Sequence, residues 1–253
     1  MHDKLTWPTP SFRGYAALLL LAIFGIIYLA LDGMNFPLRD DENHFWPNSQ
    51  IFAQSWVPSL HALRNYNELN TPLPFILFGW LEKLTGHGLP AGRLLNFLAS
   101  LGLLLLLTWQ ATQRSDLWRA LVGILSFPYF VATSVLLYTD ILATFWIVVG
   151  CWSWQKNQST LSALAFGLAI SCRQFALAFP AALLLFELGL AWQTRQFKAR
   201  TPMMAAQVLA LASIGPWIML WGGLAPPNTA AGQGLPADFT LRRFTPENSL
   251  YFL

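Results

Sequence analysis

Long apolar runs without charge recur along this chain, and they restrict its fold more than any other feature. The stretches Gly14–Leu31 and Ala120–Thr139 carry no charged residue, and each has about the length needed to cross 30 Å of hydrocarbon. Only 11% of all residues are charged, whereas a soluble domain carries about a quarter. The sequence therefore predicts an all-α fold, a polytopic transmembrane helical bundle.

Seven apolar segments fit this prediction, and an eighth is too short to span. Pro74–Leu84 has roughly the length of an interfacial or re-entrant helix, so we expect it to lie at the membrane surface. The seven predicted spans are Gly14–Leu31, Leu94–Trp109, Ala120–Thr139, Ile141–Trp154, Ser159–Cys172, Gln174–Gln193 and Pro202–Leu224.

The positions of lysine and arginine predict the orientation, because short cytoplasmic loops carry an excess of both. With the N-terminus in the cytoplasm, every short basic connection falls on the inner side. These basic residues are Lys4, Arg13, Arg114, Arg119, Lys156, Arg195, Lys198 and Arg200. Residues 32–93 then form a long outer loop with interfacial helices, and residues 225–253 form an outer tail.

The net charge of +3 does not indicate a nucleic-acid partner, because the basic residues lie in short clusters between apolar runs. The expected surroundings are membrane lipids. Residues 1–253 read as a single transmembrane domain, and we expect it to be the N-terminal portion of a longer protein.

The outer loop opens with Asp40, Asp41 and Glu42, followed by His44. Acidic residues are common in the first turn of a helix, so one interpretation is helix capping. The other is a general base or a metal site at the membrane surface. No spacing typical of a metal site accompanies these residues, so a divalent cation stays open and the metal unknown.

Two further polar motifs interrupt the apolar segments at the same face. In Tyr138-Thr139-Asp140, the carboxylate could begin a helix or belong to a functional site. In Arg173-Gln174, the arginine could mark the membrane interface or bind phosphate oxygens through its fork of donors. Arg93, at the outer start of the second span, allows the same two interpretations. Carboxylates and arginines at one outer surface suit a reaction on a lipid-linked phosphate.

The motifs Asp41-Glu42-Asn43-His44-Phe45, Asn70-Thr71-Pro72, Tyr138-Thr139-Asp140 and Arg173-Gln174 resemble those of the GT-C membrane glycosyltransferases. Their order is that of the dolichyl-phosphate-glucose α-1,2-glucosyltransferases, and the protein O-mannosyltransferase-like relatives also place a carboxylate where Asp140 lies. The resemblance extends from about residue 14 to residue 193. GT-C enzymes usually have more than seven membrane helices, so we expect a remaining portion, a partner that supplies it, or a degenerate relative of the family.

The resemblance implies a sugar transfer from a polyprenyl-phosphate donor to a hydroxyl of a lipid, glycan or protein acceptor. It implies Asp41, or its neighbour Asp40, as the catalytic base, and Glu42 completes the catalytic set. The candidate donor-binding residues are Arg173, Gln174, Asp140, Arg93, His44 and Tyr138, with Arg242 and Arg243 as further candidates for the leaving phosphate. A bacterial inner membrane is expected in preference to the endoplasmic reticulum.

Two other functions stay open from the sequence. A transporter or lipid flippase would place ionisable residues deep in several spans, but Glu187 alone is clearly of this kind. A non-catalytic subunit of a membrane assembly could use the acidic loop to dock a partner.

Overall fold

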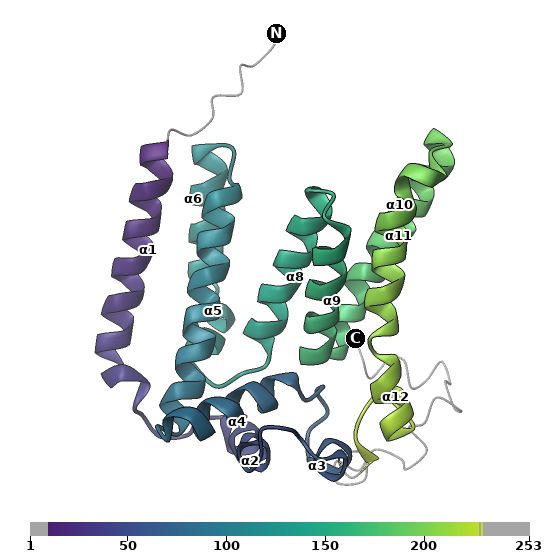
Figure 1. The fold of residues 1–253 in the computed structure, drawn as a ribbon. Helices are drawn as coiled ribbons and strands as arrows, with labels where there is room; N and C mark the ends of the chain where they lie inside the picture. The colour runs from purple at the N-terminus through teal and green to yellow at the C-terminus, as the bar shows by residue number, and fades with distance from the viewer. Residues whose placement is uncertain (1–9, 228, 230–253) are drawn as a thin grey trace.

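The computed structural model describes residues 10–227 and 229, and all regular structure in this part of the chain is helical (Figure 1). The predicted all-α fold is confirmed. The elements are α1 (Pro10–Ala30), η1 (Asp32–Met34), α2 (Glu42–Ala53), α3 (Leu60–Asn65), α4 (Leu73–Thr85), α5 (Leu89–Gln110), α6 (Arg114–Leu125), α7 (Pro128–Val135), α8 (Asp140–Gln155), α9 (Ser159–Cys172), η2 (Gln174–Leu177), α10 (Ala178–Thr194), α11 (Phe197–Ala212) and α12 (Gly215–Trp221).

Judged by length and composition, fewer helices could cross a membrane than the seven that the sequence predicts. Among the described residues, four helical segments are long and apolar enough to cross a membrane, and a fifth is added if α6 and α7 form one bent span. α8 and α9 coincide with two predicted spans, but their 16 and 14 residues correspond to only about 24 and 21 Å of helix. The count of seven is therefore not confirmed.

The prediction of one continuous span over Ala120–Thr139 is wrong. α6 ends at Leu125, α7 begins at Pro128, and the two helices meet at an angle of 69°. Phe127 between them has an extended backbone, as expected for a residue that precedes proline.

Most connections between the long helices fall at two ends of the bundle (Figure 1). The α5–α6, α8–α9 and α10–α11 junctions lie at the end drawn at the top, which also holds the start of α1. α2, α3, α4 and α12 lie at the opposite end, together with the starts of α5 and α8. The predicted outer motifs thus share one end, and the basic connections share the other.

The acidic loop is held against the bundle by close packing of α2 on α4. A Cβ atom on Gly79 of α4 would lie 2.6 Å from the carbonyl oxygen of Ser49 and 2.8 Å from the amide nitrogen of Ala53, both in α2. The aromatic side chains Phe52, Tyr66 and Phe75 are buried around this contact. The backbones of the two helices approach closely because Gly79 has no side chain.

We expect Gly79→Ala to lower the unfolding temperature, because the added methyl group meets backbone atoms that cannot rotate away. Overpacking of this kind costs about 1–3 kcal/mol. Gly25→Ala in α1 is the matched control, since a Cβ there meets nothing within 4 Å. Thermal unfolding of both variants in the same detergent tests the contact, and equal unfolding temperatures would contradict it.

Candidate active site

A buried ion pair between Glu42 and Arg93 joins the acidic loop to the first turns of α5. Both side chains are 0% exposed, and two nitrogens of Arg93 donate to the two carboxylate oxygens, with the Nε–Oε1 distance at 2.8 Å. The backbone amides of Arg39 and Leu137 also donate to Glu42, at 3.0 and 2.7 Å. The carboxylate therefore has four donors around it, which suits a fixed structural anion.

Arg93 has no donor left for a substrate. Besides Glu42, its guanidinium donates to the carbonyl oxygens of Met34, Phe36 and Pro37, and its carbon lies 3.6 Å from the centre of the Phe36 ring. These bonds use all five N–H groups of an arginine. Neither the expected catalytic role of Glu42 nor the expected phosphate contact of Arg93 fits this geometry.

One turn further along α5, Asn96 anchors the segment that leads into α8. Its amide nitrogen donates to the carbonyl oxygens of Leu136 and Tyr138, both at 2.7 Å. Together with the bond from Leu137 to Glu42, this fixes the Tyr138-Thr139-Asp140 motif beside the acidic loop. α5 thus positions two of the predicted motifs at once.

Asp41 precedes α2 as its N-cap residue and is exposed. Within the described residues, its carboxylate accepts no hydrogen bond and forms no ion pair, whereas its charge acts on Tyr138, Tyr129 and Glu68. Tyr138 lies edge-on against Phe45, and burial raises the pKa of its hydroxyl. Asp41 is therefore a free carboxylate that faces the other motifs.

Asp40 is also exposed but lies on a different side of the turn. It lines a hollow of about 410 Å³. The other lining residues include Asp32 and Arg39, which follow α1, and residues of α7. Its backbone has a φ of 47°, a left-handed conformation that aspartate tolerates better than most residues. The charges of both aspartates act on Tyr138, whereas that of Asp41 also acts on Tyr129 and Glu68.

Asp140 and Arg173 form an ion pair between the start of α8 and the end of α9. Their side chains are 17% and 26% exposed, and Arg173 makes no other hydrogen bond with a side chain or backbone group that the structure describes. Arg173 therefore keeps N–H donors that an anion could occupy. The neighbouring Gln174 is used by the fold, since its amide donates to the carbonyl oxygens of Leu69 and Leu224.

The sequence interpretation missed Glu68, in the turn between α3 and α4. Glu68 is 8% exposed, and burial raises the pKa of its carboxyl group to about 7. The charge of Asp41 raises the pKa further, while His44, the amide of Leu69 and Arg173 oppose the rise. A lone glutamate in an irregular segment shows no pattern, so only the folded chain reveals that it faces the other motifs.

The predicted residues thus divide into three groups. Asp41, exposed His44, Tyr138, Asp140 and Arg173 are linked by charge effects and one ion pair, and we call this group the carboxylate–arginine surface; buried Glu68 is influenced by the charges of Asp41, His44 and Arg173. Glu42, Arg93 and Gln174 support that surface from within, and Asp40 lies to one side. Arg242 and Arg243 lie outside the described residues.

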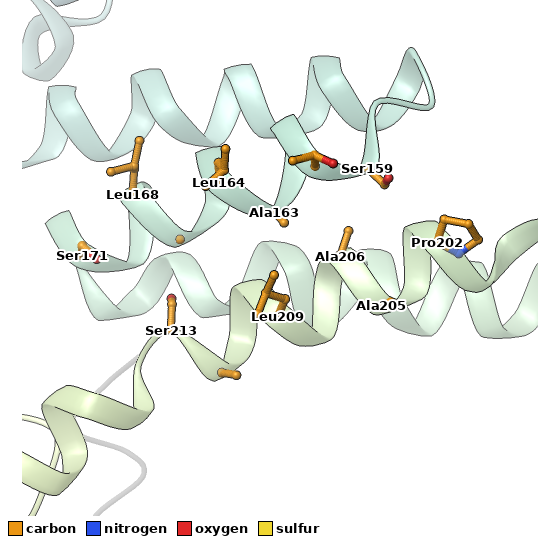
Figure 2. A pocket seen from close by; sticks show the side chains of 13 residues that line it. Ser159, Ala163, Leu164, Leu168, Ser171, Pro202, Ala205, Ala206, Leu209 and Ser213 are labelled. Atoms are coloured by element: carbon orange, nitrogen blue, oxygen red, sulfur yellow. The ribbon is translucent and has the colours of Figure 1, made fainter.

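No metal centre emerges from the described residues, since none of their histidine, cysteine and acidic side chains form a group of three or more suited to a metal ion. A second hollow, of about 660 Å³, lies between α9 and α11 (Figure 2) and is lined by small and apolar side chains such as Ala163, Gly167 and Ala206, with no charged residue. The polar chemistry is therefore concentrated at the carboxylate–arginine surface.

We expect Arg93→Ala to destabilise the protein strongly, because it leaves the buried charge of Glu42 without a partner. Breaking such a pair costs about 3–5 kcal/mol. Arg93→Lys should be nearly as damaging, since one ammonium group cannot replace the fork of donors. Thermal unfolding tests both variants, with Arg119→Ala as control, because the Asp116–Arg119 pair is exposed. Unfolding temperatures equal to that of the control would show that the pair is dispensable.

Comparison with known proteins gives one result. The profile of the DIE2/ALG10 family matches residues 76–212, which include Arg93, Asp140 and Arg173 but not Asp41 or Glu68. No curated protein and no solved structure matches the chain. The expectation of a bacterial inner membrane gains no support, because the family is one of the endoplasmic reticulum. Since the match covers more than half of the sequence, the chain belongs to the DIE2/ALG10 family, whose members are membrane glycosyltransferases of the GT-C type.

Proposed function

We propose that the protein transfers glucose from a polyprenyl-phosphate donor to a hydroxyl group of a lipid, glycan or protein acceptor, with Asp41 as the general base. The observation that carries the proposal is the carboxylate–arginine surface. There, the charges of exposed Asp41 and of the partly exposed Asp140–Arg173 pair all act on the hydroxyl group of Tyr129. Family membership supports the glucosyl transfer, whereas the identity of the base rests on this geometry.

The reaction needs a base on one side of the sugar and a cation on the other. Asp41 removes the proton from the acceptor hydroxyl, whose oxygen then attacks the anomeric carbon. The bond from that carbon to the phosphate oxygen breaks, and its electron pair leaves with the lipid phosphate. Attack opposite the leaving group inverts the configuration at the anomeric carbon.

Arg173 is the group that would stabilise the leaving phosphate, because its free N–H donors match phosphate oxygens. Asp140 holds the guanidinium in place through the ion pair and lies close enough to contact sugar hydroxyls. His44 and Tyr138 flank Asp41 and complete the sugar-binding surface. In this proposal, Glu42, Arg93 and Gln174 position these groups without touching the substrate.

The surface would face away from the cytoplasm. Support comes from the basic connections, which share the opposite end of the bundle with Arg13 at the start of α1 (Figure 1). Short basic loops favour the cytoplasmic side, which puts the N-terminus in the cytoplasm. A divalent cation is not needed in this scheme, since Arg173 supplies the positive charge for the phosphate.

Glu187, the residue that most favours a transporter, has a structural role. Glu187 is 2% exposed and accepts hydrogen bonds from the indole of Trp154 at 2.7 Å and from Arg200 at 2.9 Å. These contacts tie α10 to α8 and α11 and give the buried carboxylate a structural role. A non-catalytic subunit is the alternative that an activity measurement decides.

We expect Asp41→Asn to abolish sugar transfer while the protein keeps its unfolding temperature. Asparagine is as good an N-cap as aspartate, but its neutral amide cannot accept the proton. The loss should be at least about 100-fold, the lower range for a general base. The measurement is the rate of glucose transfer from polyprenyl-phosphate glucose by the purified protein, with a panel of lipid and glycan acceptors.

Asp40→Asn is the matched control, because asparagine also tolerates the left-handed conformation of residue 40. It should transfer sugar at close to the wild-type rate. If Asp40→Asn were inactive and Asp41→Asn active, the base would be Asp40. Near-normal transfer by both variants would exclude this motif as the base.

A further inference from the structure

A groove runs between α9 and α11, and one end of it lies beside Arg173. It is the hollow of about 660 Å³ between these two helices, and we call it the α9–α11 groove (Figure 2). Ser171 and Ser213 lie at one end, and Ser159 and Pro202 lie at the other. Ser171 is two residues before Arg173, so their Cα atoms are at most about 7 Å apart. The groove therefore begins next to the arginine that we propose to bind the phosphate.

The groove has a floor of small residues and edges formed by leucine. Ala163 and Ala206 are buried against each other, and Gly167 contributes no side chain. Leu164 and Leu209, which also line the groove, are exposed. No charged residue lines the groove, so it suits an uncharged, apolar ligand.

The dimensions of the groove suit a hydrocarbon chain better than a helix. From Ser159 to Ser171, α9 rises about 18 Å at 1.5 Å per residue. Over that length, the volume of about 660 Å³ corresponds to a mean cross-section of about 37 Å². An α-helix with its side chains is at least about 10 Å across and needs about 79 Å². A hydrocarbon chain therefore fits between the leucine edges, whereas a further helix would lie across them.

Ser171 places a hydroxyl group at the mouth of the groove that the fold does not use. It makes no hydrogen bond within the described residues, whereas Ser153, Ser162 and Ser213 each donate to a backbone carbonyl oxygen. Its side chain is partly exposed. A free donor next to Arg173 suits the oxygens of a phosphate, and the groove beyond it suits the apolar chain attached to that phosphate.

We propose that the α9–α11 groove holds the polyprenyl chain of the donor, and that its length limits how much of that chain the protein recognises. This inference rests on the proposed function and goes beyond it. Because the lipid tails of a bilayer are as apolar as the groove, the chain gains packing contacts there but little hydrophobic free energy. A chain seated between the helices brings its phosphate to Arg173 and Ser171. The isoprene units that lie more than about 18 Å from the phosphate make no contact with the groove.

The test is the KM for polyprenyl-phosphate glucose donors that differ by one isoprene unit, measured with the purified protein in one detergent. For the wild type, KM should fall with each added unit until the chain fills about 18 Å, and stay constant for longer chains. Ala205→Leu narrows the groove near the Pro202 end and should raise KM about 10-fold for the longer donors alone. Ala212→Leu narrows it near the Ser171 end and should raise KM about 10-fold for every donor. The turnover number should change little in both variants.

Ala22→Leu in α1 is the matched control, because residue 22 is also an exposed alanine of an apolar helix but does not line the groove. Its KM should equal that of the wild type for every donor. Ser171→Ala should raise KM by the same factor for all chain lengths, about 10-fold for the loss of one hydrogen bond to a charged group. All four variants should keep the unfolding temperature of the wild type.

Two outcomes would overturn the proposal: a wild-type KM that does not depend on chain length, or KM values of both groove variants that equal those of Ala22→Leu. The first needs no variant, so a variant that fails to fold does not remove the test. A wild type that transfers no glucose would contradict the proposed function instead. The rise in unfolding temperature on adding sugar-free polyprenyl phosphates then still tests the groove, since it should grow with chain length up to the same limit. A rise that is equal for all lengths would contradict the inference.

Discussion

The buried pair of Glu42 and Arg93 is the interaction on which the rest of the site depends. Three segments meet at these two side chains, and the third is far from the first two in the sequence. They are the chain after α1, the start of α2 and the linker before α8. An ion pair without solvent contact is stable only when every polar group around it is satisfied, and here each donor of Arg93 has an acceptor. Its geometry therefore permits little variation in the position of Asp41.

The same arrangement separates structural charges from those available for chemistry. Glu42, Arg93 and Glu187 are buried and paired, Glu187 with the partly exposed Arg200, because an unpaired buried charge would be costly. Asp41 and Arg173 keep free acceptors or donors at the surface. Adjacent residues thus have opposite roles: Glu42 holds the loop, and Asp41 faces the space where a substrate would bind.

The sequence predicts the all-α membrane fold and helices such as α8 and α9, because apolar length depends on local composition. It failed where three-dimensional contacts decide. The break between α6 and α7 was hidden in one apolar run, although Pro128 was a usable signal. The sequence makes Arg93 a candidate phosphate ligand, because its burial depends on Glu42, 51 positions away. Glu68 was missed because its importance arises from neighbours on α2 and α9.

A structure of the protein with an unreactive phosphonate analogue of polyprenyl-phosphate glucose and an acceptor tests the central claim most directly. The account predicts the acceptor hydroxyl within about 3.2 Å of the Asp41 carboxylate, the phosphonate against Arg173, and an unchanged pair of Glu42 and Arg93. A phosphonate bound by Arg93, or a sugar in the hollow beside Asp40 and Arg39, would contradict it.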